Sequence, residues 1–354
     1  MTDQTPSPSE MEQPKRVIDA VNLVKYYPIT QGIIFKKQVG TVHAVDGITI
    51  WLDKGETLAI VGESGCGKST AGRLLLGLER PTEGTISVLG DDITEMSEKD
   101  LRTKRRDIQI ILQDPYTSLN PRMTVGSIIG EPFDIHPEVL NGRTKAEAVR
   151  ALMDKVGLDP EFISRYPHQF SGGQRQRIGV ARALALNPDI IVADEPVSAL
   201  DVSVQAQVMN LLLDLRDEFG LSYIFVSHDL AVVRQIADRI AVMYLGKVVE
   251  TGPQEAIFAA PSHPYTVALM SAAPIPDPTA QEQRVRIELE GDVPSPIDPP
   301  SGCRFRTRCW KAQEICATDE PALLEITPGH LAACHFPVPP EESADVIPDD
   351  PEPV

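Results

Sequence analysis

The chain has 354 residues, of which 42% are apolar and 24% are charged, and its 51 acidic and 33 basic side chains give a formal net charge of −18. This apolar fraction allows a large core and excludes a wholly disordered chain. The negative charge disfavours a general binder of nucleic-acid phosphates. Because no run of about eighteen residues is apolar enough to span a bilayer and the N-terminus lacks the pattern of a secretion signal, we expect a cytosolic chain.

Residues 1–15 and 339–354 are rich in proline and acidic side chains, which predicts disordered tails. Between them, residues 16–255 alternate apolar runs of strand length with amphipathic stretches of helical length. Runs such as Thr57–Val61 and residues 190–193 lack polar alternation, which indicates a parallel sheet covered on both faces. The sequence therefore predicts an α/β fold.

Residues 256–338 differ from the preceding part of the chain, because proline-rich connections separate short elements and lead into a group of cysteines. We predict a smaller C-terminal domain here. Its cysteines are Cys303, Cys309, Cys316 and Cys334. In a reducing compartment, an odd total of five cysteines favours metal binding or free thiols over disulfides. Four thiolates can bind zinc or an iron–sulfur cluster, although the spacings lack the C-x-x-C pairs typical of structural zinc.

A glycine-rich loop follows the apolar run Thr57–Val61 and precedes a helical stretch at residues 71–78. Its sequence, Gly-Glu-Ser-Gly-Cys-Gly-Lys-Ser-Thr at residues 62–70, matches the phosphate-loop pattern in the required strand-to-helix context. Backbone N–H groups bind phosphate oxygens in such a loop, Lys68 reaches the β- and γ-phosphates, and Ser69 ligates Mg²⁺. The predicted nucleotide contacts are Ser64, Gly65, Cys66, Gly67, Lys68, Ser69 and Thr70, of which Cys66 occupies a variable position of the motif.

Two adjacent carboxylates, Asp194 and Glu195, end the apolar run at residues 190–193. Successive residues at a strand end point to different sides, so the two can take different roles. Asp194 can hold the Mg²⁺ shell while Glu195 polarises a water molecule against the γ-phosphate. The alternative, that the pair only caps the next helix, is the weaker interpretation after a phosphate loop.

The segment Phe-Ser-Gly-Gly-Gln-Arg-Gln-Arg at residues 170–177 resembles the signature of the ATP-binding cassette (ABC) family, and the resemblance covers residues 17–251 with the motifs in order. It implies an ATPase with a RecA-like core, an antiparallel β subdomain and a helical signature subdomain. In this family two cassettes pack head to tail, and each signature covers the ATP held by the other chain's phosphate loop. The signature residues that the resemblance assigns to ATP are Ser171, Gly172, Gly173 and Gln174.

The resemblance also implies roles for three residues outside these motifs. Gln113 is similar to the glutamine that senses Mg²⁺ and the transmembrane partner. Asp201 resembles part of the loop that couples the two ATP sites. His228 follows the apolar run 223–226 and resembles the switch histidine that contacts the γ-phosphate and holds the catalytic carboxylate. The predicted catalytic residues are therefore Gln113, Glu195 and His228.

The family stacks adenine on an aromatic residue near the N-terminus. The usual spacing after a lysine, here Lys25, favours Tyr27 over Tyr26. Both tyrosines could instead be packing residues.

Residues 113–126, the run Ser-His-Pro-Tyr-Thr at residues 262–266 and the cysteine-bearing end resemble ATP-binding subunits of oligopeptide and dipeptide importers. Residues 28–44 are similar to the second of the two non-identical cassettes that such importers use. The resemblance implies a heterodimeric partner cassette, two membrane permeases, an external substrate-binding protein and no nucleic acid. It also implies peripheral attachment at the cytoplasmic face of the membrane and a 4Fe–4S cluster on the four cysteines.

Two other functions are alternatives to an importer ATPase. A soluble ABC ATPase that acts on nucleic acid or ribosomes would have a long coiled coil between its half-sites or two cassettes in one chain, and the sequence has neither. A degenerate cassette that binds ATP without cleaving it is disfavoured because Glu195, His228 and the signature are intact.

Overall fold

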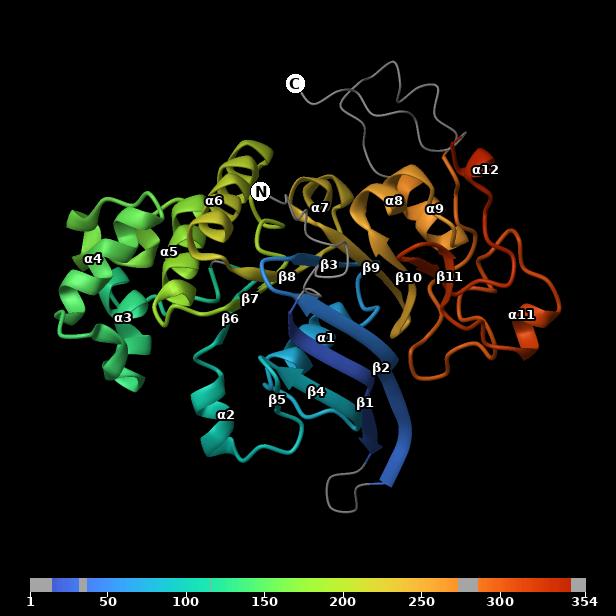
Figure 1. Cartoon of the computed structure of the whole chain (residues 1–354), viewed down its shortest axis with the longest axis horizontal. Coiled ribbons are helices and arrows are strands. Elements are labelled where there is room, and N and C mark those ends of the chain that lie inside the picture. The colour runs from blue at the N-terminus through green and yellow to red at the C-terminus, as the bar shows by residue number, and fades with distance from the viewer. Residues whose placement is uncertain (1–14, 32–36, 115, 273–285, 345–354) are drawn as a thin grey trace, which may run out of the picture.

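The computed structural model describes residues 15–31, 37–114, 116–272 and 286–344. Most of the two predicted tails therefore lies outside the described residues. The α/β class predicted from the sequence is confirmed. Figure 1 shows a central sheet with helices above it, a second sheet below it and a helical region at one end.

The central sheet has eight strands in the order β11-β12-β10-β9-β3-β8-β7-β6. Its five strands from β9 to β6 are parallel, whereas β10, β12 and β11 continue the sheet in antiparallel pairing. Every residue of β3 and β8 is buried, as expected for parallel strands covered on both faces. The bounds are β3 (Thr57–Val61), β6 (Ile108–Ile111), β7 (Ile190–Asp194), β8 (Ser222–Ser227), β9 (Arg239–Tyr244), β10 (Lys247–Pro253), β11 (Leu324–Thr327) and β12 (His330–Ala332).

Helices cover both faces of this sheet (Figure 1). On one side lie α6 (Val202–Phe219), α7 (Leu230–Ile236), α8 (Gln254–Ala259) and α9 (Pro264–Ala272), and on the other lies α1 (Lys68–Leu75). The second sheet is antiparallel, in the order β2-β1-β4-β5, and its apolar side chains share one core with α1 and the facing side of the central sheet. Its strands are β1 (Arg16–Gln31), β2 (Lys37–Asp53), β4 (Glu83–Val88) and β5 (Asp91–Asp92).

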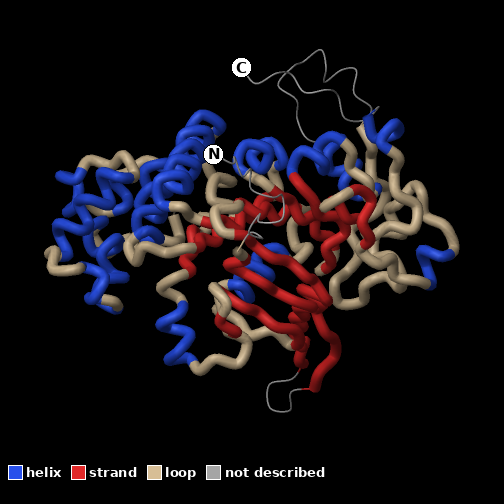
Figure 2. The backbone as a smooth tube through the Cα atoms, viewed as in Figure 1, coloured by secondary structure: helices blue, strands red, loops and turns tan. Residues whose placement is uncertain are grey.

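The helical region lies at one end of the molecule, where Figure 2 shows helices and loops without strands. Its helices are α3 (Val125–Ile135), α4 (Lys145–Lys155) and α5 (Gly172–Leu184), with 3₁₀ turns at Pro137–Leu140, Pro160–Ser164 and Pro167–Gln169. The remaining short helices are α2 (Glu98–Lys104), α11 (Ile315–Thr318) and α12 (Pro340–Ala344). The antiparallel sheet and the helical region match the two subdomains that the sequence resemblance implies.

The region after residue 256 is joined to the central sheet, so a separate C-terminal domain is not confirmed. Strand β12 pairs with β10, with Glu250 opposite Ala332. The fully buried carboxylate of Glu250 accepts hydrogen bonds from the backbone N–H groups of Ser262 (2.6 Å) and His263 (2.9 Å), and its Oε1 lies 2.7 Å from Nε2 of His330. One buried acid therefore holds the start of the C-terminal region against the sheet.

The prediction of a disordered tail from residue 339 is wrong at its beginning. Residues Pro340–Ala344 form α12, and the side chain of Ser343 in it is fully buried. The backbone N–H of Ser343 donates to Pro339 O (3.1 Å), and Lys311 Nζ lies 3.1 Å from the Glu342 carboxylate. A local backbone hydrogen bond and one ion pair thus order a segment whose composition alone indicated a solvated tail.

The buried imidazole of His263 should make stability depend on pH. Burial lowers its pKa to about 3, and its Nδ1 accepts a hydrogen bond from the Tyr265 N–H (3.1 Å). Because the unfolded chain binds a proton near pH 6.5 and the folded chain does not, this contribution is complete above pH 6.5 and is lost as the pH falls towards 3.

We expect wild type to lose about 2 kcal/mol more unfolding free energy than His263→Asn between pH 7 and pH 5. Urea unfolding at the two pH values measures this difference. Equal losses in both proteins would show that His263 is not buried in its neutral form.

Candidate nucleotide-binding and catalytic site

The phosphate loop, between β3 and α1, packs against backbone on two sides. Gly62 and Gly67 have φ angles of 150° and 110°, and a Cβ atom on them would lie 2.2 Å from Met243 O and 2.0 Å from Ala44 O. Only glycine fits such positions. At Gly65, with φ of 80°, a Cβ would meet nothing within 4 Å. The loop is therefore tight towards the protein and open on the side where phosphates would approach.

A cavity of about 780 Å³ adjoins the loop, and most of the predicted nucleotide and catalytic side chains line it. Its lining outside the loop comes from Tyr27, Val42, Ala44, Gln113, Glu195, His228, Leu269 and Pro296. Within the loop, Ser64, Gly65, Gly67, Lys68, Ser69 and Thr70 line the cavity. Residues from distant parts of the sequence thus meet at one site.

Cys66 differs from its neighbours in the loop. Its side chain is buried rather than among those lining the cavity, and a Cβ on Gly62 would lie 2.9 Å from its sulfur. Burial raises the pKa of the Cys66 thiol. The Cys66 side chain points into the core behind the loop. The prediction that Cys66 contacts the nucleotide therefore does not hold for its side chain.

Lys68 and Ser69 are held in place by the protein itself. Lys68 Nζ donates hydrogen bonds to Gly62 O (2.7 Å) and Glu63 O (3.0 Å), so the ammonium is aligned along the loop. Ser69 Oγ donates to Asp194 Oδ1 (3.0 Å). Burial and the adjacent charge of Glu195 raise the pKa of Asp194, while the Ser69 hydrogen bond lowers it. A hydroxyl beside a partly buried carboxylate at a phosphate loop is a donor set that fits Mg²⁺.

Both carboxylate oxygens of Glu195 have partners. Gln113 Nε2 donates to Oε2 (2.7 Å), and His228 Nδ1 lies 3.1 Å from Oε1. The backbone N–H of Glu195 donates to Val226 O (2.9 Å), and its φ of 46° lies in the left-handed region that non-glycine residues rarely adopt. Glu195 is thus fixed in backbone and side chain between the ends of β7 and β8.

The signature lies apart from this cavity, and none of its residues is in the lining. Ser171 caps α5: its Oγ accepts from the Gln174 N–H (3.3 Å), and Gln174 Oε1 accepts from the Ser171 N–H (3.0 Å). Gly173 is buried against α6, where a Cβ would lie 2.3 Å from the Val204 side chain, and Gly172 is half-buried. Asp201 is exposed and precedes α6 without capping it. The chain therefore presents a helix N-terminus for anions separately from its phosphate loop.

The two candidate tyrosines for adenine occupy different positions. Tyr27 lines the cavity, and its hydroxyl donates to the Glu79 carboxylate. Tyr26 donates instead to Asp46 (2.6 Å), packs on the His43 ring and is not in the lining. Tyr27 is thus in place for the predicted stacking.

Sequence reasoning missed Val42, Ala44, Leu269 and Pro296, which also line the cavity. They belong to β2, α9 and a loop of the C-terminal region. No motif surrounds them, since they reach the site only through the packing of distant segments.

The four C-terminal cysteines lie near one another but do not form a metal site in this arrangement. Burial raises the pKa of Cys309 to about 11 and that of Cys334 to about 12, and the other cysteines add to both effects. Cys303 and Cys316 are joined by a backbone hydrogen bond of 2.8 Å. Within the described residues, no three His, Cys, Asp or Glu side chains are placed to hold a metal ion. The predicted 4Fe–4S cluster is therefore not supported by the geometry.

Comparison with known proteins places this site in a family. The family model described as "ABC transporter" matches residues 45–198, and that described as "Oligopeptide/dipeptide transporter, C-terminal region" matches residues 249–316. The chain is 53% identical over 321 residues to the oligopeptide transport ATP-binding protein AppF of Bacillus subtilis, covering 90% of this chain and 97% of AppF. The chain belongs to the ABC transporter ATP-binding proteins of the oligopeptide and dipeptide group. It is an ATPase subunit of an ABC transporter.

Other relatives agree with this assignment. The dipeptide transport ATP-binding protein DppF of Haemophilus influenzae is 52% identical, over 92% of this chain and 98% of DppF. A solved dimer of the ATP-binding cassette MJ0796 with ADP and phosphate has a TM-score of 0.58 and 29% identity, covering 67% of this chain and 98% of that one. These similarities do not support an ABC ATPase that acts on nucleic acid or ribosomes. No helix in the described part of this ABC subunit is long and apolar enough to cross a membrane.

We expect Glu195→Gln in the ABC subunit to slow ATP hydrolysis at least about a hundredfold, because Glu195 is the predicted general base. ATP binding should persist, and the closed cassette dimer should accumulate. Phosphate release and size-exclusion chromatography with MgATP measure the two effects.

The exposed acid Glu255 on α8 provides a matched control, and Glu255→Gln should behave as wild type. Normal turnover in Glu195→Gln would exclude the catalytic role of this residue.

Proposed function

We propose that this ABC ATPase subunit supports the import of peptides, either oligopeptides or dipeptides. The C-terminal family match and the names of relatives such as AppF and DppF support this cargo, because the similarity extends over nearly their whole length. The observation that carries the proposal is the joint presence of an ATP-binding cavity at the phosphate loop and a peptide-transporter C-terminal region in one chain.

The chain's own residues suggest how the site works. Lys68 and the loop N–H groups bind the phosphates, and Tyr27 stacks on the adenine. Ser69, Asp194 and Gln113 hold Mg²⁺, which neutralises phosphate charge when bound. Glu195 takes a proton from the attacking water, and its fixed contacts with Gln113 and His228 orient it for this step.

We infer that a second cassette completes the site, with its signature over the ATP of this chain, while Ser171 and the residues after it serve the partner. The separation of signature and cavity supports this arrangement. A non-identical second cassette, two permeases and an external binding protein complete the proposed importer. The subunit then lies at the cytoplasmic face of the membrane, attached through the permeases.

The assembled importer tests the proposed function. In proteoliposomes, we expect the binding protein loaded with peptide to raise ATPase activity several-fold over the unloaded protein and to drive peptide uptake. Lys68→Ala should abolish both, because it removes the charge that reaches the phosphates. ATPase activity that does not respond to any peptide, together with no peptide uptake, would contradict peptide import.

The 4Fe–4S cluster remains a separate prediction, which rests on the resemblance of the cysteine-bearing end to peptide-importer subunits. Metal binding would require these thiols to lose their protons and to move into coordinating positions. Anaerobic purification followed by iron and sulfide analysis tests this prediction. About four irons per chain would support it; one zinc per chain would favour a zinc site, and no metal would favour free thiols.

A further inference from the structure

We propose that Arg308 and Tyr265, both in the C-terminal region, are positioning residues for the phosphate loop, and that Arg308 offsets the negative charge of Glu63 beside the bound phosphates. Both act through Glu63, the second residue of the loop motif. The inference rests on ATP binding at this loop and adds a specific function for the C-terminal region.

The contacts are direct and largely shielded from solvent. Arg308 Nη1 donates to Glu63 Oε2 at 2.8 Å, and the Arg308 side chain is only 9% exposed. The backbone N–H of Glu63 donates to the hydroxyl of Tyr265 at 2.8 Å, and Tyr265 is fully buried. Glu63 O also accepts a hydrogen bond from Lys68 Nζ. One loop residue therefore connects the C-terminal region to the phosphate-binding lysine.

Arg308 and Tyr265 are themselves held rigidly. Phe305 is buried between Tyr244 and Tyr265, with ring centroids 5.3 and 5.4 Å away. Arg304, which directly follows Cys303, donates hydrogen bonds to Leu245 O and to the Asp46 carboxylate. Aromatic packing and ion pairing thus fix the segment before Arg308.

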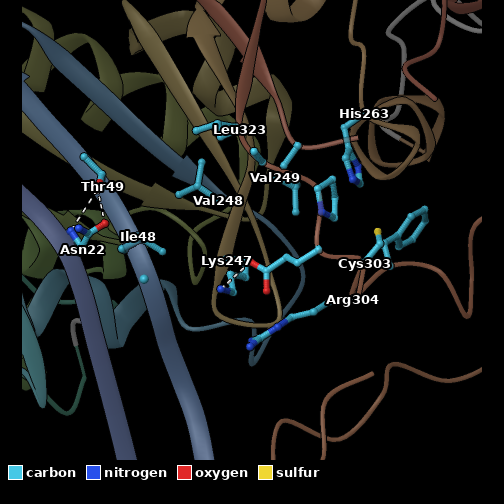
Figure 3. A pocket seen from close by; sticks show the side chains of 16 residues that line it. Asn22, Ile48, Thr49, Lys247, Val248, Val249, His263, Cys303, Arg304 and Leu323 are labelled. Carbon is cyan, nitrogen blue, oxygen red and sulfur yellow. Dashed lines mark hydrogen bonds and ion pairs between the residues drawn. The ribbon is translucent and has the colours of Figure 1, made fainter. Parts of the chain in front are cut away.

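Figure 3 shows Arg304 and Cys303 beside a cavity of about 290 Å³ between β2, β10 and the C-terminal region. The charged groups at this cavity already have partners: Lys247 lies 2.8 Å from Glu320, and Arg304 is paired with Asp46. The charged side chains at this cavity are therefore not available to bind a ligand. The segment that carries Arg304 is better explained as a support for the phosphate loop.

Electrostatics gives Arg308 a role beyond packing. Glu63 lines the ATP cavity, so its carboxylate opposes the approach of a polyanion. Burial disfavours the charged form of Arg308, but the hydrogen bonds and charges of Glu63 and Tyr244 outweigh this effect and raise the pKa of Arg308. The guanidinium thus remains charged and neutralises the acid. Without it, the loop would present an uncompensated negative charge to ATP.

Loss of the Arg308 charge and loss of the Glu63 charge should therefore change the affinity for ATP differently. In the full chain, we expect Arg308→Gln to weaken binding of the Mg²⁺ complex of a non-hydrolysable ATP analogue about fivefold, and more at low salt. Glu63→Gln should leave affinity equal or tighter. The double variant Glu63→Gln/Arg308→Gln should recover most of the loss, because the repelling acid is gone. Calorimetric titration measures all three.

Further variants separate the effect of the Arg308 charge from an effect on folding. Arg308→Lys keeps the charge and should bind nearly as wild type, and Tyr265→Phe should weaken binding without a change in salt dependence. Arg306→Gln is the matched control, because Arg306 bonds to Ser301 in the same segment and not to the loop.

The inference is overturned if Arg308→Gln binds as wild type, or if Glu63→Gln weakens binding as much as Arg308→Gln and the double variant shows no recovery. An ion pair that only stabilises the fold would give this second result, with equal weakening in both single variants and no recovery in the double variant. Failure of wild type to bind the analogue would refute the ATP site itself, whereas peptide-independent transport activity would refute only the proposed cargo.

Discussion

The ATP site depends on how closely the phosphate loop approaches the backbone on both of its sides. Gly62 packs against β9 and Gly67 against β2, at distances that no Cβ atom tolerates. Backbone hydrogen bonds continue this contact, since Gly246 N donates to Cys66 O (2.8 Å) and Asp46 N donates to Gly246 O (2.9 Å). The loop is thus fixed between the central sheet and the antiparallel sheet, and a rigid loop presents its N–H groups to phosphates without a reordering cost.

The same arrangement explains why the predicted catalytic side chains converge. Parallel strands β3, β7 and β8 are neighbours, so the phosphate loop, Asp194, Glu195 and His228 emerge at one edge of the sheet. There Ser69 contacts Asp194, and His228 contacts Glu195. Glu195 therefore connects the segments that carry Gln113 and His228 at this edge of the sheet.

The motifs and strand ends could be predicted from the sequence because local patterns specify them. The apolar run Thr57–Val61, the loop glycines and the Asp194–Glu195 pair all lie where their patterns placed them. The burial of the Cys66 side chain, the pairing of β12 with β10 and the helix α12 could not be predicted. Each depends on contacts between segments far apart in the chain. The iron–sulfur prediction rested on resemblance, and the cysteine geometry does not support it.

We propose that this chain holds ATP on its own phosphate loop and that the signature of another cassette completes the site. The most direct test is an experimental structure of the Glu195→Gln importer with MgATP. We expect the γ-phosphate to contact Lys68 and Ser69 of this chain and the signature serine of the partner cassette. Phosphates bound away from residues 62–70, or covered by Ser171 of the same chain, would contradict it.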